Sequence, residues 1–365
     1  MSGLPPALTA PKQIVYLWGA VATQAEASFL GARPVNLLMR DSDHLGEGVA
    51  TRILNKLPKK WRSSFAPDTG ADIEKLISLL AASNLSGYEK LAEKIRRLYF
   101  EDICRSLAAA KILTNPSLAI VLLTLHRDTH FNTHEQISGI ITTNHDGLLQ
   151  VASQKVFGAV NLGVSFQARE LEASSSDTTP VLLHLHGSFT WTFGLPMRVS
   201  LLDDNSTYSP ETIWIPPTIL KESKSYPFNK LAGQAYELLS RRCDVLRVVG
   251  SSLTQNDWNI ISIIFNAQRH RESRKLPPFR IELIMSPKSG EAIADDCSYL
   301  RNLTPISYLS DGDFSSYKED ESTYSTEMRN AFFYWLKQKL TYHRQRGDVN
   351  MPLTSALATV AGDIS

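Results

Sequence analysis

The sequence has little cysteine and no excess of charge of either sign. Its 365 residues include only three cysteines, Cys104, Cys243 and Cys297, and no two of them form a C-x-x-C pair. This excludes cysteine-based zinc modules and a disulfide framework, and it is typical of proteins in the reducing cytoplasm. The formal net charge of +1 argues against electrostatic capture of nucleic acid or of an anionic membrane by the whole chain.

Long apolar runs are absent as well. The longest, residues 118–125 with one threonine, is far shorter than the roughly 20 residues of a membrane-spanning helix. Residues 1–11 lack the basic and apolar regions of an export signal. A hydrophobic fraction of 43% and a charged fraction of 21% exclude general disorder. We therefore expect a soluble, cytoplasmic protein with no direct membrane contact.

Short apolar runs alternate with helical patterns along the chain. The strand-like runs are residues 13–18, 138–143, 181–185, 244–249 and 279–285, and a second short apolar run spans 35–39. Because these runs are apolar on both faces, they predict an α/β fold with a Rossmann-like parallel sheet covered by helices. The first run stops at Gly19, and small residues follow it, which is typical of the opening of a nucleotide-binding α/β fold.

Helical spacing dominates between the first strand and the second. We expect helices over 72–84, 87–110 and 116–128, and later ones over 231–242 and 328–346. The predicted organisation is a core of residues 1–41 and 136–310, an all-helical insertion of residues 42–135, and a C-terminal helix with a flexible tail in residues 311–365.

Polar or glycine-containing sets follow the predicted strands, where an open parallel sheet binds its ligands. They are Gly19-Ala20-Val21-Ala22-Thr23, Thr142-Thr143-Asn144-His145-Asp146, His184-Leu185-His186-Gly187-Ser188 and Gly250-Ser251-Ser252-Leu253. In order and content, these sets resemble those of sirtuins. The segments TTNHD, LHLHGS, PPTILK and VVGSSLTQNDW, with the opening GAVATQAEASFLGARPVNLLMRDS, resemble more closely the sirtuin-like domains of bacterial antiphage defence proteins. The resemblance covers about residues 14–40 and 136–290.

The resemblance implies a pocket that holds NAD and breaks the bond between nicotinamide and ribose through an oxocarbenium-like transition state. Asn144 and His186 would be the catalytic residues. A side-chain amide suits positioning because it donates and accepts at once, and a histidine suits the role of base. Asp146 would orient ribose hydroxyls or the ring amide. The other expected NAD-binding residues are Gly19, Ala20, Ala22, Thr23, Thr143, Gly250, Ser251 and Ser252.

Two features depart from the sirtuin pattern. Val21 stands where the family has a glycine, and a β-branched residue there restricts the approach of phosphate to the backbone. We therefore expect Val21→Gly to strengthen NAD binding. The helical insertion also takes the place of the four-cysteine zinc module, so we expect no zinc. Because that module supports the acyl-peptide groove, its absence favours water as the acceptor, and hence NAD hydrolysis.

The resemblance further implies an effector that depletes cellular NAD during phage infection, yielding ADP-ribose and nicotinamide. Such an effector would be regulated by assembly into a large homo-oligomer and by pairing with a HerA-type hexameric ATPase. It would contact nucleic acid only through this ATPase. One alternative is a non-catalytic subunit that binds NAD or ADP-ribose as a sensor or scaffold. Another is a protein deacylase or ADP-ribosyltransferase.

Several of these residues also have simpler interpretations. Asn144 and Asp146 are residue types that often form turns after strands. His184 and His186, two apart on a strand, suggest a metal pair, but no third ligand is evident and we predict no metal site. Asp257 follows the Gly-Ser-Ser-Leu turn and is either a helix N-cap or a contact to the adenosine ribose. No G-x-S-x-G motif supports a Ser-His-Asp hydrolase.

Overall fold

The apolar runs form one parallel sheet. The computed structural model describes residues 10–29, 35–41, 45–64, 73–82, 86–127, 135–168, 179–203, 205–218, 224–251, 253, 257–284, 306–308 and 335–336. The main sheet has six strands in the order β10 (Ile306–Tyr308), β9 (Arg280–Ile284), β8 (Val245–Val249), β1 (Lys12–Trp18), β2 (Glu135–Thr142) and β4 (Val181–His184). Every neighbouring pair is parallel, as the burial of both strand faces predicts.

The strand order is that of the doubly wound dinucleotide-binding fold. From β4 to β10 along the sheet, the strands follow the 3-2-1-4-5-6 pattern, with β1 in the central position of strand 1. The order of connection therefore reverses between β1 and β8. In such sheets, the crevice for a ligand lies at this reversal, outside the carboxyl ends of the two strands.

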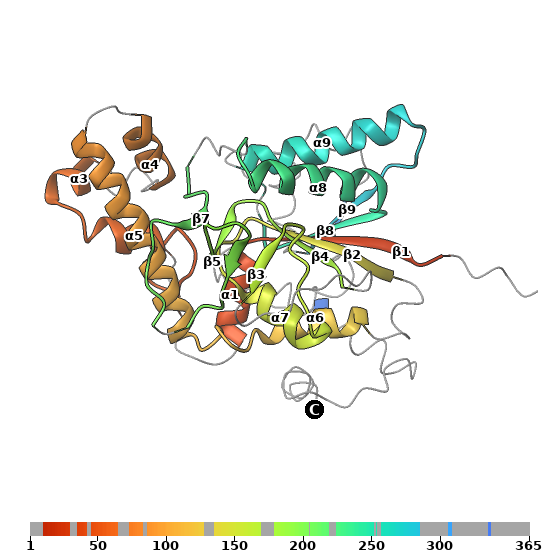
Figure 1. Ribbon diagram of the computed structural model, residues 1–365, viewed down its shortest axis with the longest axis horizontal. Coiled ribbons are helices and arrows are strands. Elements are labelled where there is room, and N and C mark those ends of the chain that lie inside the picture. The colour runs from red at the N-terminus through yellow and green to blue at the C-terminus, as the bar shows by residue number, and fades with distance from the viewer. Residues whose placement is uncertain are drawn as a thin grey trace, which may run out of the picture.

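Helices cover both faces of the sheet (Figure 1). On one face lie α8 (Phe228–Arg241) and α9 (Trp258–Ser273), which pack against each other. On the other face lie α1 (Ala20–Phe29), α6 (Ser117–Arg127) and α7 (Leu148–Phe157). The long apolar run of the sequence is α6, which is buried in the main core against α7 and β2. The fold is thus an α/β sandwich in three layers.

A buried carboxylate joins two of these helices. The side chain of Glu26 on α1 accepts hydrogen bonds from the backbone N–H groups of Leu118 and Ala119, at 3.0 and 2.6 Å, in the first turn of α6. The first N–H groups of a helix have no partner within the helix, so Glu26 supplies one. Burial raises the pKa of Glu26 to about 8, although these N–H groups lower it. The link helps to hold α1 in place, and the first turn of α1 contributes to the functional site.

The remaining described helices of the predicted insertion form a cluster of their own. They are α2 (Val49–Leu54), α3 (Lys59–Ser64), α4 (Ile73–Ala82) and α5 (Ser86–Ala109), and Figure 1 shows α3, α4 and α5 beside the sheet. Their apolar faces meet in a separate core that includes Ile53, Leu76, Leu80 and Ile95. A second small cluster, containing Phe100 and Cys104 of α5, packs this group against the rest of the protein.

A small second sheet lies next to this cluster. Its strand order is β3 (Phe166–Ala168), β6 (Met197–Val199), β5 (Gly187–Thr192) and β7 (Thr212–Trp214). Strand β5 starts immediately after the turn that follows β4. Through this small sheet, the chain passes from the carboxyl edge of the main sheet toward the helical cluster.

The apolar run 35–39 is not a strand, although its composition resembles one. The side chain of Gln24 on α1 binds it instead, donating to the Val35 carbonyl at 2.9 Å and accepting from the Leu37 N–H at 2.6 Å. These contacts use backbone groups that a strand would pair with a neighbour. The segment is thereby held beside α1.

No helix in the described part of the chain is long and apolar enough to cross a membrane. The predicted C-terminal helix over 328–346 lies outside the described residues except for Trp335 and Leu336. These two residues are helical and are buried in the main core.

Candidate functional site

The register of the sheet brings the predicted polar sets to one edge. Trp18 at the end of β1 pairs with Thr142 on one side and with Val249 on the other. Thr142 in turn pairs with His184 at the end of β4. The residues that follow these four strand ends therefore leave the sheet side by side. The structure thus brings the four polar sets together at one edge of the sheet.

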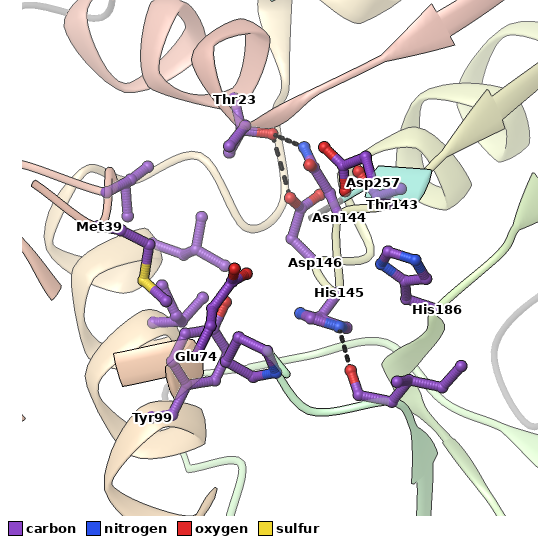
Figure 2. A pocket seen from close by; sticks show the side chains of 16 residues that line it. Thr23, Met39, Glu74, Tyr99, Thr143, Asn144, His145, Asp146, His186 and Asp257 are labelled. Atoms are coloured by element: carbon purple, nitrogen blue, oxygen red, sulfur yellow. Dashed lines mark hydrogen bonds between the residues drawn. The ribbon is translucent and has the colours of Figure 1, made fainter. Parts of the chain in front are cut away.

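A cavity lies at this edge, with walls from both the sheet and the helical cluster (Figure 2). Six of the eleven predicted site residues line it: Ala20, Thr23, Thr143, Asn144, Asp146 and His186. Gly19, Ala22, Gly250 and Ser251 are not among the lining residues, and they lie in α1 or in the segments that follow β1 and β8. Ser252 is outside the described residues.

Gly19 and Gly250 bring the two central turns into direct backbone contact. A Cβ atom on Gly19 would lie 2.4 Å from the Gly250 carbonyl oxygen, and one on Gly250 would lie 2.3 Å from the Ala22 nitrogen. Gly250 also has a φ of +61°, which favours glycine. The N–H of Gly19 donates to the Val249 carbonyl and that of Val21 to the Gly250 carbonyl, at 2.9 and 3.0 Å. Both glycines are therefore required for the packing at the sheet's reversal point, whatever ligand binds there.

Val21 does not face the cavity. Its side chain is partly buried against the main core, and its N–H is engaged by Gly250. These contacts give Val21 a packing role, and its effect on NAD binding stays a prediction. Ala22 and Ser251 are buried nearby, and the Ser251 hydroxyl oxygen accepts from the Leu253 N–H at 3.4 Å.

Asn144, Thr23 and Asp146 form a hydrogen-bonded chain across the cavity floor (Figure 2). The Nδ2 of Asn144 donates to the Gly19 carbonyl at 3.0 Å and to the Thr23 hydroxyl at 2.9 Å. The Thr23 hydroxyl donates to the Asp146 Oδ2 at 3.0 Å. Asn144 is thus more than a turn residue, since it connects the end of β2 to the start of α1.

Asp146 is a buried carboxylate with a local structural role. Its Oδ1 accepts from the Leu148 N–H at 3.1 Å, at the start of α7. Burial raises its pKa, while the hydrogen bonds from Leu148 and Thr23 lower it. Asp146 therefore stabilises the turn into α7 and also places a polar group on the cavity wall.

Three histidines occupy this edge, each with different partners. The Nε2 of His186 lies 3.0 Å from the Nδ2 of Asn259 on α9. The Nε2 of His145 lies 2.9 Å from the Ile215 carbonyl oxygen, and its ring centroid is 6.2 Å from that of His186. His184 is buried away from the cavity, with its Nδ1 3.2 Å from the Asn144 carbonyl oxygen. His184 therefore supports the Asn144 loop from behind.

The metal-pair interpretation finds no support in these contacts, because His184 and His186 contact different groups. In the ranges that the structure describes, no group of three His, Cys, Asp or Glu residues is placed to hold a metal ion. Burial lowers the pKa of His184 to about 4, which keeps this ring neutral near pH 7.

The helical cluster supplies the second wall of the cavity, which the sequence analysis missed. Figure 2 shows Met39, Glu74 and Tyr99 on the side opposite Asn144 and His186. Tyr99 stacks on Trp214 of β7 with ring centroids 5.6 Å apart and an interplanar angle of 8°. This stacking fixes the aromatic wall relative to the small sheet.

Two aspartates outside the eleven predicted site residues differ in their position relative to the cavity. Asp257 stands at the N-cap position of α9 but makes no capping hydrogen bond through its side chain, and it lines the cavity. Asp41 is not among the residues that line the cavity, and its Oδ1 accepts from the Gly48 N–H at 2.7 Å beside α2. Only Asp257 is therefore placed to contact a bound molecule.

The chemistry available in the cavity is that of positioning and proton transfer. It contains an amide, two imidazoles and carboxylates on one side, and a carboxylate with apolar and aromatic groups on the other. No nucleophile–base pair of the Ser-His or Cys-His kind is among the lining residues.

Comparison with known proteins gives little independent information. No family model matches the sequence, and no curated protein matches it. A solved chain described by the words "Structural Basis for the Mechanism and Regulation of Sir2 Enzymes" is 15% identical over 92% of this chain and 95% of its own length, with a TM-score of 0.38. A likeness at this level supports no conclusion about function.

Proposed function

We propose that this protein binds NAD at the reversal point of its sheet and hydrolyses it to ADP-ribose and nicotinamide. The observation that carries the proposal is the meeting of Asn144, Asp146 and His186 with the first turn of α1 in one cavity, at the crevice where the doubly wound fold binds dinucleotides. The motif resemblance to sirtuin-like defence proteins supports the same reaction.

In this reaction, the water oxygen bonds to the ribose carbon as the bond to nicotinamide breaks, and the water proton leaves for a base. Nicotinamide departs as a neutral pyridine, so no general acid is needed. Asn144 would position the ribose or the water through its amide oxygen, because its Nδ2 is engaged by Gly19 and Thr23. His186 would accept the proton.

The wider proposal is an effector of bacterial antiphage defence that depletes cellular NAD. It would act as a large homo-oligomer with a HerA-type hexameric ATPase, in the cytoplasm. Its support is the motif resemblance. Light scattering of the protein alone and mixed with such an ATPase tests this assembly, and a monomer under both conditions would contradict it.

Incubation of the purified protein with NAD, with and without the ATPase, tests the reaction itself. Nicotinamide and ADP-ribose are measured by chromatography. We expect turnover that Asn144→Ala and His186→Ala abolish, while the exposed control Asn205→Ala and the α9 control His270→Ala retain it. Products that appear only with an acyl-peptide or protein acceptor would instead indicate a deacylase or transferase.

A non-catalytic NAD- or ADP-ribose-binding subunit is the second candidate. The feature that favours it is Val21, which stands where the sirtuin pattern has a pocket glycine. Calorimetric NAD binding without turnover in any assembly state would establish this alternative.

A further inference from the structure

The two helices on one face of the sheet end together at the edge opposite the cavity. Helix α8 ends just before β8 begins, and α9 ends before β9 begins, so both helix ends lie at the amino edge of the parallel sheet. Arg271 near the end of α9 donates to the Ser240 carbonyl near the end of α8 at 3.3 Å. This bond holds the two ends side by side, as the paired helices in Figure 1 show.

Exposed basic side chains lie at these helix ends. Arg242 is the C-cap residue of α8, Arg274 is that of α9, and Lys275 follows it. These three residues are here called the basic patch, and all three are exposed. Within the described part of the chain, none of their side chains forms an ion pair or a hydrogen bond. The patch therefore presents its charges to solvent.

The carboxylates of the same helix ends do not neutralise the patch. Glu237 forms an ion pair with Arg241 at 2.8 Å, and Glu272 forms one with Arg269 at 2.6 Å, each within its own helix. Asp244 accepts a hydrogen bond of 2.8 Å from a backbone N–H of β1. The amino edge thus carries a local positive charge, although the whole chain has a formal net charge of only +1.

Stabilisation of the helix ends does not account for this arrangement. The C-terminal end of a helix carries a partial negative charge that favours a nearby cation in its last turn. Arg241 already supplies that cation in α8, and Arg271 supplies it in α9. The basic patch comes after both, so its charges are additional and are free to bind an anionic partner.

Two partly buried rings next to the patch favour nucleic acid as that partner. Tyr236 on α8 and His270 on α9 meet edge to face, with ring centroids 5.8 Å apart and an interplanar angle of 76°. His270 lies one helical turn before Arg274. Rings beside arginines suit a nucleic acid, because guanidinium groups bind phosphates in a bidentate manner while rings contact sugars or bases. An acidic protein surface offers no such partner for the rings.

We propose that the basic patch binds the phosphate backbone of nucleic acid. Arg242 and Arg274 would each bind a phosphate through parallel N–H groups, and Lys275 would add a point charge. Because phosphates carry no sequence information, binding would not depend on base sequence. The chain would then contact nucleic acid directly, and not only through a partner ATPase. The inference does not depend on the proposed hydrolysis, since the patch lies at the opposite edge from the cavity.

Fluorescence anisotropy with labelled single-stranded and duplex DNA tests the proposal, using the full chain without NAD over a series of salt concentrations. The variant replaces the whole patch, Arg242→Gln, Arg274→Gln and Lys275→Gln together. We expect its affinity to fall about tenfold or more at low salt. The plot of log affinity against log salt should become less steep by about two to three. Each single substitution should lower that slope by about one.

The matched control removes the same charge from another surface. Lys90→Gln, Lys94→Gln and Arg105→Gln together change three exposed residues of α5 and should leave affinity within about twofold. Thermal unfolding checks that both triple variants remain folded. Equal losses of affinity in the two variants would attribute binding to net charge and overturn the inference. Absence of salt-dependent binding to either DNA would overturn it as well. Displacement of the DNA by polyglutamate as readily as by unlabelled DNA would assign the patch to an acidic protein instead.

Discussion

The hydroxyl of Thr23 donates a hydrogen bond of 3.0 Å to the buried carboxylate of Asp146, and these residues come from different strand ends. The same hydroxyl accepts from Asn144 at 2.9 Å. A single oxygen atom thus connects the start of α1 to the loop after β2. Together with the bond from Asn144 to the Gly19 carbonyl, this oxygen helps to hold the cavity floor in shape.

Thr23→Val keeps the shape of the side chain and removes this oxygen. We expect a loss of about 1–3 kcal/mol in the free energy of unfolding, because Asp146 loses a donor in a buried position. Any NAD turnover should fall at least tenfold. The matched control is Thr124→Val on α6, whose hydroxyl binds only the Ile120 carbonyl of its own helix. Equal losses in chemical denaturation of the two variants would contradict a special role for Thr23.

Val21→Gly separates the packing role of this residue from its expected effect on NAD binding. Because Val21 packs against the core and its N–H is already bonded, we expect lower stability, by about 1–3 kcal/mol. If packing is the whole role of Val21, affinity for NAD, measured by calorimetry, stays within about twofold of the unsubstituted protein. Tighter binding would show that the valine obstructs the ligand after all. Val21→Ile keeps the apolar side chain and serves as the control.

The fold was largely predictable because its signals are local. Runs such as 13–18 are apolar on both faces, and only a sheet covered on both sides buries them. The floor of the cavity was predictable for a similar reason, since residues after parallel strand ends leave at one edge. Run 35–39 has the same composition, but its backbone is bound by the Gln24 side chain, a contact that no local pattern reveals.

The second wall was not predictable, because it depends on how the helical cluster meets the sheet. Glu74 and Tyr99 sit in amphipathic helices whose pattern is explained by packing within that cluster. Asn259 is similarly one polar residue among others on α9. Only the tertiary arrangement places these side chains beside Asn144 and His186.

His184 should make stability depend on pH. Burial lowers its pKa to about 4 from an ordinary value near 6.5, so the unfolded chain binds a proton that the folded protein does not. The contribution of His184 to the free energy of unfolding is fully present above pH 6.5. It decreases by up to about 3 kcal/mol as the pH drops toward 4. Thermal unfolding of His184→Gln should show a flatter pH dependence between these values. The control His270→Gln should keep the original slope.

A buried ion network behind the sheet gives a prediction independent of any activity. Arg247 on β8 binds Glu135 through two contacts of 2.6 Å and Glu282 at 2.7 Å, and its side chain is 3% exposed. Arg247→Leu removes the buried cation between Glu135 and Glu282, while Arg280 still contacts Glu282 at 2.9 Å, and we expect a loss of about 3–5 kcal/mol in chemical denaturation. The surface pair of Arg269 and Glu272 provides the control, since Arg269→Leu should cost less than about 1 kcal/mol. A similar cost for both would mean that water reaches the buried pair.

Glu74 tests whether the helical cluster belongs to the functional site. It brings a carboxylate to the cavity from α4, opposite His186, while the rest of that wall is apolar or aromatic. If a substrate fills the cavity, Glu74→Gln removes a charge beside it and should change kcat or KM for NAD by about tenfold, with little effect on stability. Glu89→Gln in the exposed first turn of α5 changes the same charge away from the cavity and should have no effect. Unchanged kinetics in Glu74→Gln would confine the site to the sheet edge, and the cluster would then serve only to enclose it.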